Sequence, residues 1–168
     1  VIKVDQGLDT GDVVLDTSIE ISNEDTYQDL EKKLSQLSKN ILPMFFEKLA
    51  ANTKMVPQDN TQATYAEKIN KTEAKIDWQD DAILINQKIR AFNPNPGAWF
   101  ELDGKRIKIM GSKIIDIKGK PGVILTDEFI IACGNQAIQP TTLKKEGKGL
   151  VTLAEFLKGN QVVPGTQL

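Results

Sequence analysis

The sequence predicts two parts, an α/β segment and, after it, a small antiparallel β-barrel or sandwich. Apolar residues in the first fifty positions recur at strand and then at helical spacing, whereas later they alternate in short runs separated by turn residues. Residues 1–77 carry 14 acidic and 9 basic side chains, but residues 78–168 carry 9 acidic and 12 basic ones. We therefore predict one module over residues 1–51, a polar linker over 52–75 and a second module over 76–168.

A strand–turn–strand unit and a helix are predicted for the first module. Residues 1–4 and 13–21 are rich in β-branched residues, and the turn between them, "GLDTGDVV", carries Asp9. "SNED" offers a helix cap followed by acidic residues at the positive end of a helix. The apolar stripe of that helix has steps of three and four residues: Tyr27, Leu30, Leu34, Leu37 and Ile41. Pro43 is expected to kink the helix or to begin a second one.

Short strands framed by two helices are predicted for the second module. A helix beginning after Asp80 or Asp81 is expected to end at "NPNPG", because proline cannot continue a helix. "AWFEL" and "KRIKIM" are joined by Asp103-Gly104, the pair that a type I′ hairpin turn favours. Further strands are predicted at "KIIDI", "GVILT", "FIIAC" and "QAIQP", and a last helix at "TLAEFLK", capped by Thr152. This succession is typical of a small barrel or sandwich.

The composition excludes several classes of protein and site. With 168 residues, of which 40% are hydrophobic and 26% charged, the chain has the composition of a globular protein, and no apolar run suggests a membrane span. The single cysteine, Cys133, excludes an internal disulfide and indicates a reducing, cytoplasmic setting. It lies in the apolar run "FIIACG", which predicts a buried, inert thiol. The absence of histidine excludes a Ser-His-Asp triad and a His-ligated metal, so no metal site is predicted.

Asp9 lies on a glycine-closed turn, which leaves two interpretations open. Its carboxylate can form the turn by accepting hydrogen bonds from backbone amides. Hydrophobic-Asp-Thr-Gly is also how an aspartic protease presents a catalytic carboxylate, and that site requires a second glycine-bearing apolar segment such as "IIACGNQ". Because "IIACGNQ" falls in the other predicted module, the protease interpretation is disfavoured.

Basic residues gather in the second module, and we predict that they contact the phosphates of an RNA backbone. A solvated lysine-rich surface is the alternative interpretation. Arg90 is expected either to contact RNA or to pair with Asp77 or Asp81. Of Trp99 and Phe100, at least one is expected in the core, and an exposed ring could stack on a base. The predicted RNA contacts are Arg90, Lys105, Arg106, Lys108, Lys113, Lys144, Lys145 and Lys148, with the last three in a Gly-flanked loop.

Four segments, "DQGLDTGDVV", "TYAEKINKTEAKIDW", "IRAFNPNPGAW" and "VPGTQL", resemble in order and spacing the C-terminal part of the methionyl-tRNA formyltransferases. The resemblance implies that residues 1–51 are the end of a doubly wound, Rossmann-like catalytic domain. It implies that residues 76–168 form a barrel resembling an OB fold that helps to hold tRNA. The implied reaction moves a formyl group from 10-formyltetrahydrofolate to the amino group of initiator methionyl-tRNA, in an enzyme that is monomeric at full length.

The same resemblance places the family's catalytic aspartate on Asp9, through the "LDTGD" match. The family's catalytic Asn and His, and its main folate-binding loop, have no counterpart in these 168 residues. The chain is therefore expected to be a fragment with no formyltransferase activity by itself. Two alternatives stay open, a sugar-nucleotide formyltransferase of the same superfamily and a non-catalytic RNA-binding module.

Overall fold

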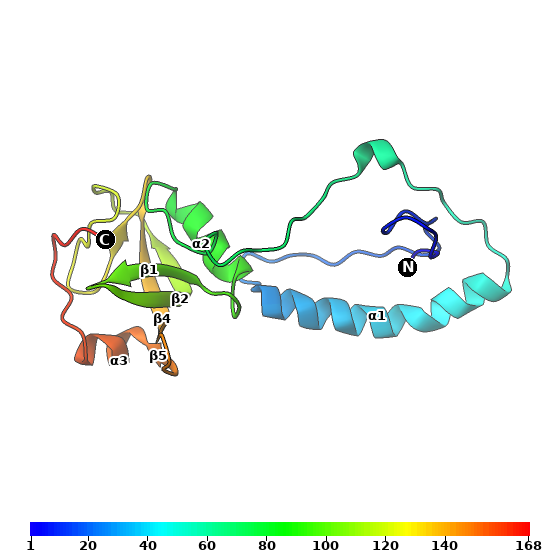
Figure 1. Ribbon diagram of the computed structural model, residues 1–168. Helices are drawn as coiled ribbons and strands as arrows, with labels where there is room; N and C mark the ends of the chain where they lie inside the picture. The colour runs from blue at the N-terminus through cyan, green and yellow to red at the C-terminus, as the bar shows by residue number, and fades with distance from the viewer. The chain divides into compact units, whose positions relative to one another are not determined.

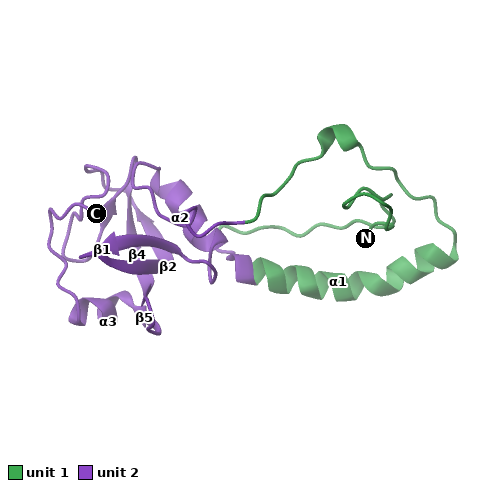
Figure 2. Cartoon of the chain, in the orientation of Figure 1, with its two compact units in different colours: residues 1–23, 29–68 green, residues 24–28, 69–168 purple.

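The computed structural model describes all 168 residues, which separate into two compact units (Figure 2). Unit 1 comprises residues 1–23 and 29–68, and unit 2 comprises residues 24–28 and 69–168. Unit 2 thus begins its main part at Ile69, within the segment predicted as a linker. The boundaries proposed from the sequence stay a prediction.

Unit 1 contains one long helix and little regular pairing. Helix α1 (Tyr27–Ala50) continues through Pro43, so the alternative of a second helix beginning there is wrong. A short 3₁₀ helix, η1 (Asn60–Gln62), follows. The two predicted strands are also wrong, because Val13 forms only isolated bridges, to Ile2 and to Val56. A run of β-branched residues becomes a strand only beside a partner of matching length, and unit 1 supplies none.

The apolar stripe of α1 is not buried within the chain. No residue of this helix is buried. In the stripe, Tyr27 and Leu34 are 51% and 50% exposed, and the other three residues are half-buried, while Phe46 beyond it is 61% exposed. Met44 and Leu49 are exposed to a similar extent. A helix with this pattern normally packs its stripe against a neighbouring layer. The face therefore suits contact with a further layer of protein.

Unit 2 is a small antiparallel half-barrel with two covering helices (Figure 1). Its elements are α2 (Ala82–Ala91), β1 (Ala98–Leu102), β2 (Lys105–Ile115), β3 (Ile131–Ala132), β4 (Ala137–Lys145), β5 (Leu150–Thr152) and α3 (Leu153–Lys158). The strand order is β1-β2-β4-β3, and β5 pairs with β4 at the other end from β3. The prediction of a small antiparallel β-domain is confirmed.

Local signals for turns and caps are realised as predicted. Asp103 and Gly104 have φ angles of 52° and 69°, the left-handed values of a type I′ turn, and they join β1 to β2. Thr152 caps α3 in a reciprocal capping box with Glu155. Hydrogen bonds from Thr152 hold the pKa of the Glu155 carboxyl below its ordinary value. Asp81 precedes α2 as predicted, although its side chain makes no capping hydrogen bond.

One predicted strand and one predicted loop in this unit are wrong. "GVILT" forms only isolated bridges, at Val123 and Ile124. Lys144 and Lys145 belong to β4 rather than to a loop, and only Lys148 lies in the turn that follows. Strand β4 extends this far because it pairs with β2 on one edge and with β5 on the other. Pairing between strands that are distant in the chain cannot be predicted from a single stretch of sequence.

A chain of aromatic contacts fills the core of unit 2. Trp78 meets Phe100 edge to face at 5.6 Å, and Phe129 stacks on Phe156 at 5.8 Å with an interplanar angle of 3°. Phe100 and Phe129, 6.1 Å apart, link the two pairs. Because alternate residues of a strand point to opposite faces, burying Phe100 in this core directs its neighbour Trp99 to the outer face of the sheet.

Candidate nucleic-acid interface

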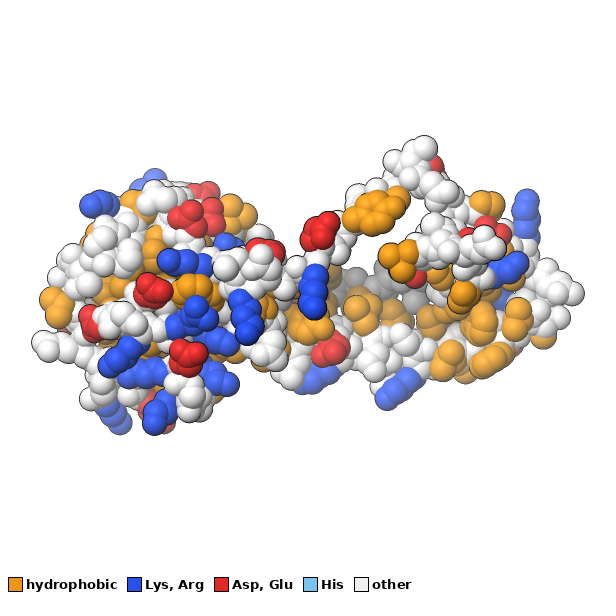
Figure 3. Space-filling view, in the orientation of Figure 1, with side chains coloured by type: hydrophobic (Ala, Val, Ile, Leu, Met, Phe, Trp, Pro, Cys, Tyr) orange, Lys and Arg blue, Asp and Glu red, His pale blue; other side chains and the backbone are white.

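The register of the sheet places three side chains in one row across its outer face. Lys108 of β2 lies opposite Trp99 of β1 on one side and opposite Lys144 of β4 on the other. Ile107 and Ile109, which flank Lys108, point into the core instead. Figure 3 shows Lys and Arg side chains gathered on the face of unit 2 that carries β1 and β2.

Lys108 and Lys144 form a like-charged cross-strand pair. Like charges directly opposite each other on adjacent strands destabilise a sheet. Neither lysine has a carboxylate within ion-pair distance, and Lys144 is exposed. Gly97 leaves room for the Lys108 stem, because a Cβ at that position would lie 2.8 Å from Lys108 Cδ. An anion bound between the two ammonium groups would relieve their repulsion.

Trp99 is covered rather than open for base stacking, which agrees with the prediction that at least one of Trp99 and Phe100 lies in the core. The indole is 7% exposed, and the Arg106 guanidinium carbon lies 3.9 Å from its ring centroid. Lys75 Nζ lies 5.5 Å from the same centroid. The indole Nε1–H donates to the carbonyl of Lys71 at 3.1 Å. Phe100 is buried as well, so both aromatic residues contribute to packing.

Two of the predicted RNA contacts are engaged inside the fold. Arg90 donates from Nη1 to the carbonyl of Asp25 at 2.8 Å and from Nε to Asn86 Oδ1 at 3.3 Å. The structure thus brings Arg90 to Asp25, not to either of its two predicted acidic partners. Lys145 donates to Asn160 Oδ1, and its ammonium lies 5.3 Å from the centroid of Phe156. It therefore faces the core side, opposite to Lys144.

The remaining predicted contacts are exposed but are spread over the unit. Lys105 begins β2 beside the hairpin turn, and Lys148 lies in the turn between β4 and β5. Lys113 lies beyond a register irregularity between Ile109 and Ser112. The pairing of Lys108 with Lys144 was not visible in the sequence, because it depends on the register of two strands far apart in the chain.

In the loop that carries Asp9, the carboxylate that accepts hydrogen bonds belongs to Asp5 and not to Asp9. Asp5 Oδ1 accepts from the backbone N–H of Gly7 at 3.0 Å and from Thr10 Oγ1 at 2.6 Å. Asp9 has a φ of 57°, and only its backbone carbonyl is held, by Gln58 Nε2 at 2.8 Å. Its carboxylate is exposed and makes no hydrogen bond, so Asp5 forms the turn and leaves Asp9 projecting from it.

Cys133 is a buried thiol, as predicted. It is 1% exposed, and burial raises its pKa to about 12. A thiol reacts as the thiolate, so we expect Cys133 to resist an aromatic disulfide reagent at pH 8 in the folded chain and to react fully in denaturant. The absorbance of the released thiolate measures both states. Rapid labelling of the folded chain would contradict the burial.

Neither a metal centre nor a membrane span is found. No group of three or more His, Cys, Asp or Glu side chains is placed so that it could hold a metal ion. None of the helices is both long and apolar enough to cross a membrane.

Comparison with known proteins places the chain in a family. Residues 68–161 match the family model described as the formyl transferase C-terminal domain. The chain belongs to the formyltransferase C-terminal domain family. Curated methionyl-tRNA formyltransferases from Acidiphilium cryptum and Rhizobium etli are each 38% identical to it over the whole chain. The chain spans 55% and 56% of their lengths, about half of each protein.

Two solved structures share the fold of this chain. HypX from Aquifex aeolicus in complex with tetrahydrofolic acid aligns with a TM-score of 0.69 at 21% identity, over 99% of this chain and 33% of HypX. An N-formyltransferase from Helicobacter canadensis, solved with folinic acid and dTDP-3-aminofucose, aligns with a TM-score of 0.64 at 22% identity. That alignment covers 83% of this chain and 53% of the other. At these identities the likeness shows the fold alone.

Proposed function

We propose that the chain is the C-terminal part of a methionyl-tRNA formyltransferase. The observation that carries this proposal is the 38% identity, over every residue of the chain, to curated enzymes of that name. Residues 1–51 are then the end of a doubly wound catalytic domain, residues 52–75 a linker and residues 76–168 an OB-like barrel. The apolar stripe of α1, of which no residue is buried, supports the first assignment, because it suits a helix that packs on the rest of such a domain.

The proposed substrates are 10-formyltetrahydrofolate and initiator methionyl-tRNA, in a monomeric cytoplasmic enzyme. The tetrahydrofolic and folinic acids named with the structural relatives support a folate donor. We assign no residue of this chain to the folate. The uncompensated pair of Lys108 and Lys144 supports an RNA partner, because a phosphate would lie between two ammonium groups.

Asp9 is the residue that this chain is proposed to contribute to chemistry. Attack of an amine on the formyl group gives a tetrahedral oxyanion, which needs hydrogen-bond donors. The amine must lose a proton, and the leaving nitrogen of the folate must gain one. A carboxylate can accept the amine proton through water, or orient a neighbouring histidine and raise its pKa. The free, projecting carboxylate of Asp9 suits either role.

A substrate competition distinguishes this function from its nearest alternative. The longer protein that contains this chain is offered methionyl-tRNA and a dTDP-amino sugar, with labelled 10-formyltetrahydrofolate as donor. We expect the label in methionyl-tRNA, with the sugar left unmodified. Label in the sugar alone would establish a sugar-nucleotide formyltransferase, which the likeness to the Helicobacter canadensis enzyme makes the second candidate. If the protein binds RNA but formylates neither methionyl-tRNA nor the amino sugar, it is a non-catalytic RNA-binding module.

A further inference from the structure

Three long side chains of unit 2 donate to backbone carbonyls of the segments that connect it with unit 1. Segment 24–28 lies between the two stretches of unit 1, and segment 69–76 follows unit 1. Arg90 holds the first segment through the carbonyl of Asp25. Trp99 holds the second through Lys71, and Lys88 Nζ holds it through the carbonyl of Lys75 at 3.3 Å.

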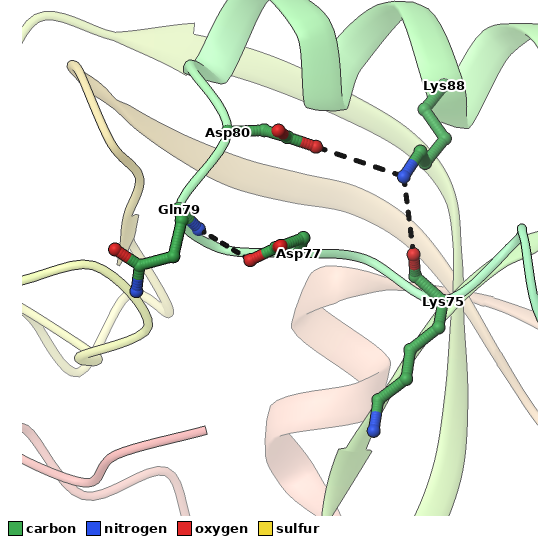
Figure 4. A network of polar contacts seen from close by, with 5 residues as sticks. All are labelled: Lys75, Asp77, Gln79, Asp80 and Lys88. Carbon is green, nitrogen blue, oxygen red and sulfur yellow. Dashed lines mark hydrogen bonds and ion pairs between the residues drawn. The ribbon is translucent and has the colours of Figure 1, made fainter.

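Segment 69–76 is secured by backbone pairing as well as by these side chains. The N–H of Trp99 donates to Ala74 and the N–H of Ile76 donates to Trp99, both at 2.8 Å. Ala74 is fully buried. Figure 4 shows Lys88 between the Asp80 carboxylate, 3.9 Å away, and the Lys75 carbonyl, while the Lys75 ammonium extends in the other direction.

Arg106 covers the outward-facing ring of Trp99, which is only 7% exposed, and so holds the indole in place. Its guanidinium lies over the ring at 3.9 Å, where a cation–π contact fixes the orientation of the Nε1–H toward Lys71. Of the eight predicted RNA contacts, Arg90 therefore holds one connecting segment directly, and Arg106 contacts the Trp99 ring that holds the other.

We infer that Arg90, Trp99 and Lys88 form an anchor for the two connecting segments and act as positioning residues. The inference rests on the proposed function, in which the sheet holds RNA while the reaction takes place elsewhere in the protein. The effective concentration of a tethered partner depends on the length of its free linker. Releasing residues 69–76 would lengthen that linker by about 27 Å when extended. The anchor sets the reach of the RNA-binding sheet.

Limited proteolysis tests the anchor on segment 69–76. Trypsin can cleave after Lys68, before the anchored segment, and after Lys71 within it. Trp99→Phe removes the indole donor and keeps a ring beneath Arg106. We expect cleavage after Lys71 to rise at least five-fold in Trp99→Phe, with cleavage after Lys105 unchanged. Unchanged cleavage after Lys71 would overturn the inference. An equal rise in cleavage after Lys105 would also overturn it, because that result reports loosening of the whole unit.

A glutamate-specific protease tests the anchor on segment 24–28. Arg90→Met removes the donor to Asp25, so we expect faster cleavage after Glu24 and unchanged cleavage after Glu20 in unit 1. Arg90→Lys retains one donor and is expected to restore much of the protection. Equal cleavage in all three proteins would contradict the assignment of Arg90.

The consequence for catalysis is tested in the longer protein with Arg90→Met and Trp99→Phe combined. We expect KM for methionyl-tRNA to rise at least five-fold, with kcat at saturating tRNA unchanged and the salt dependence of RNA binding unaltered. A shallower salt dependence would make Arg90 an RNA contact and overturn the inference. If the variants change proteolysis as expected but the longer protein formylates no RNA, the anchor is supported and the proposed function is rejected.

Discussion

Formyl transfer to methionyl-tRNA is expected to be undetectable for these 168 residues alone. The chain has no histidine, and its candidate catalytic carboxylate projects from an exposed loop without a hydrogen-bonding partner. General acid–base groups contribute about 10²–10⁴-fold each, and an oxyanion donor about 10²–10³-fold. The isolated chain, assayed with labelled 10-formyltetrahydrofolate, should therefore give no label in methionyl-tRNA above a protein-free blank.

The longer protein supplies the positive control and shows what Asp9 contributes. Asp9→Asn in that protein is expected to lower kcat by about 10²–10⁴-fold while leaving RNA affinity unchanged. Asp16→Asn, an exposed carboxylate beyond the same loop, is the matched control and should have no effect. Formylation by the isolated chain, or equal activity of Asp9→Asn, would show that the chemistry depends on other groups.

Much of unit 2 could be predicted from the sequence because its signals are local. Asp103-Gly104 can adopt the left-handed angles of a type I′ turn, and adjoining residues alternate between core and surface. At the start of α3, the Thr152 side chain accepts a hydrogen bond from the Glu155 backbone N–H, and the Glu155 side chain accepts one from the Thr152 backbone N–H. Such features depend on a few neighbouring residues, so no knowledge of the rest of the fold is needed to recognise them.

What the sequence could not show depends on contacts between distant segments. Lys144 and Lys145 are neighbours in the chain, yet one faces outward beside Lys108 and the other lies against Phe156. Only the register of β4 against β2 decides which is which, and a shift of one residue would exchange them. The covering of Trp99 also depends on a distant segment, because its indole donates to the carbonyl of Lys71, 28 residues earlier in the chain. In unit 1, β-branched runs did not become strands, because no partner strand lies beside them.

Reversing the charge of the cross-strand pair, with Lys108→Glu and Lys144→Glu together, is expected to weaken RNA binding at least ten-fold at moderate salt. Each ammonium that meets a phosphate releases about 0.7–0.9 counterion, so the slope of log affinity against log salt should become shallower by about 1.5. Filter binding of tRNA across a salt series measures both quantities. The structure describes these lysines without carboxylate partners, so their loss breaks no ion pair of the fold.

The control must carry the same change in net charge, because any added negative charge weakens RNA binding at long range. Lys39→Glu with Lys54→Glu meets this condition, since both lysines are exposed and belong to unit 1. The control is expected to lower affinity slightly and to leave the salt slope unchanged. Equal slopes for the two double variants would mean that the lysines of the sheet are a solvated surface. A shallower slope for the sheet variant alone assigns the phosphate contacts to the row that the strand register creates.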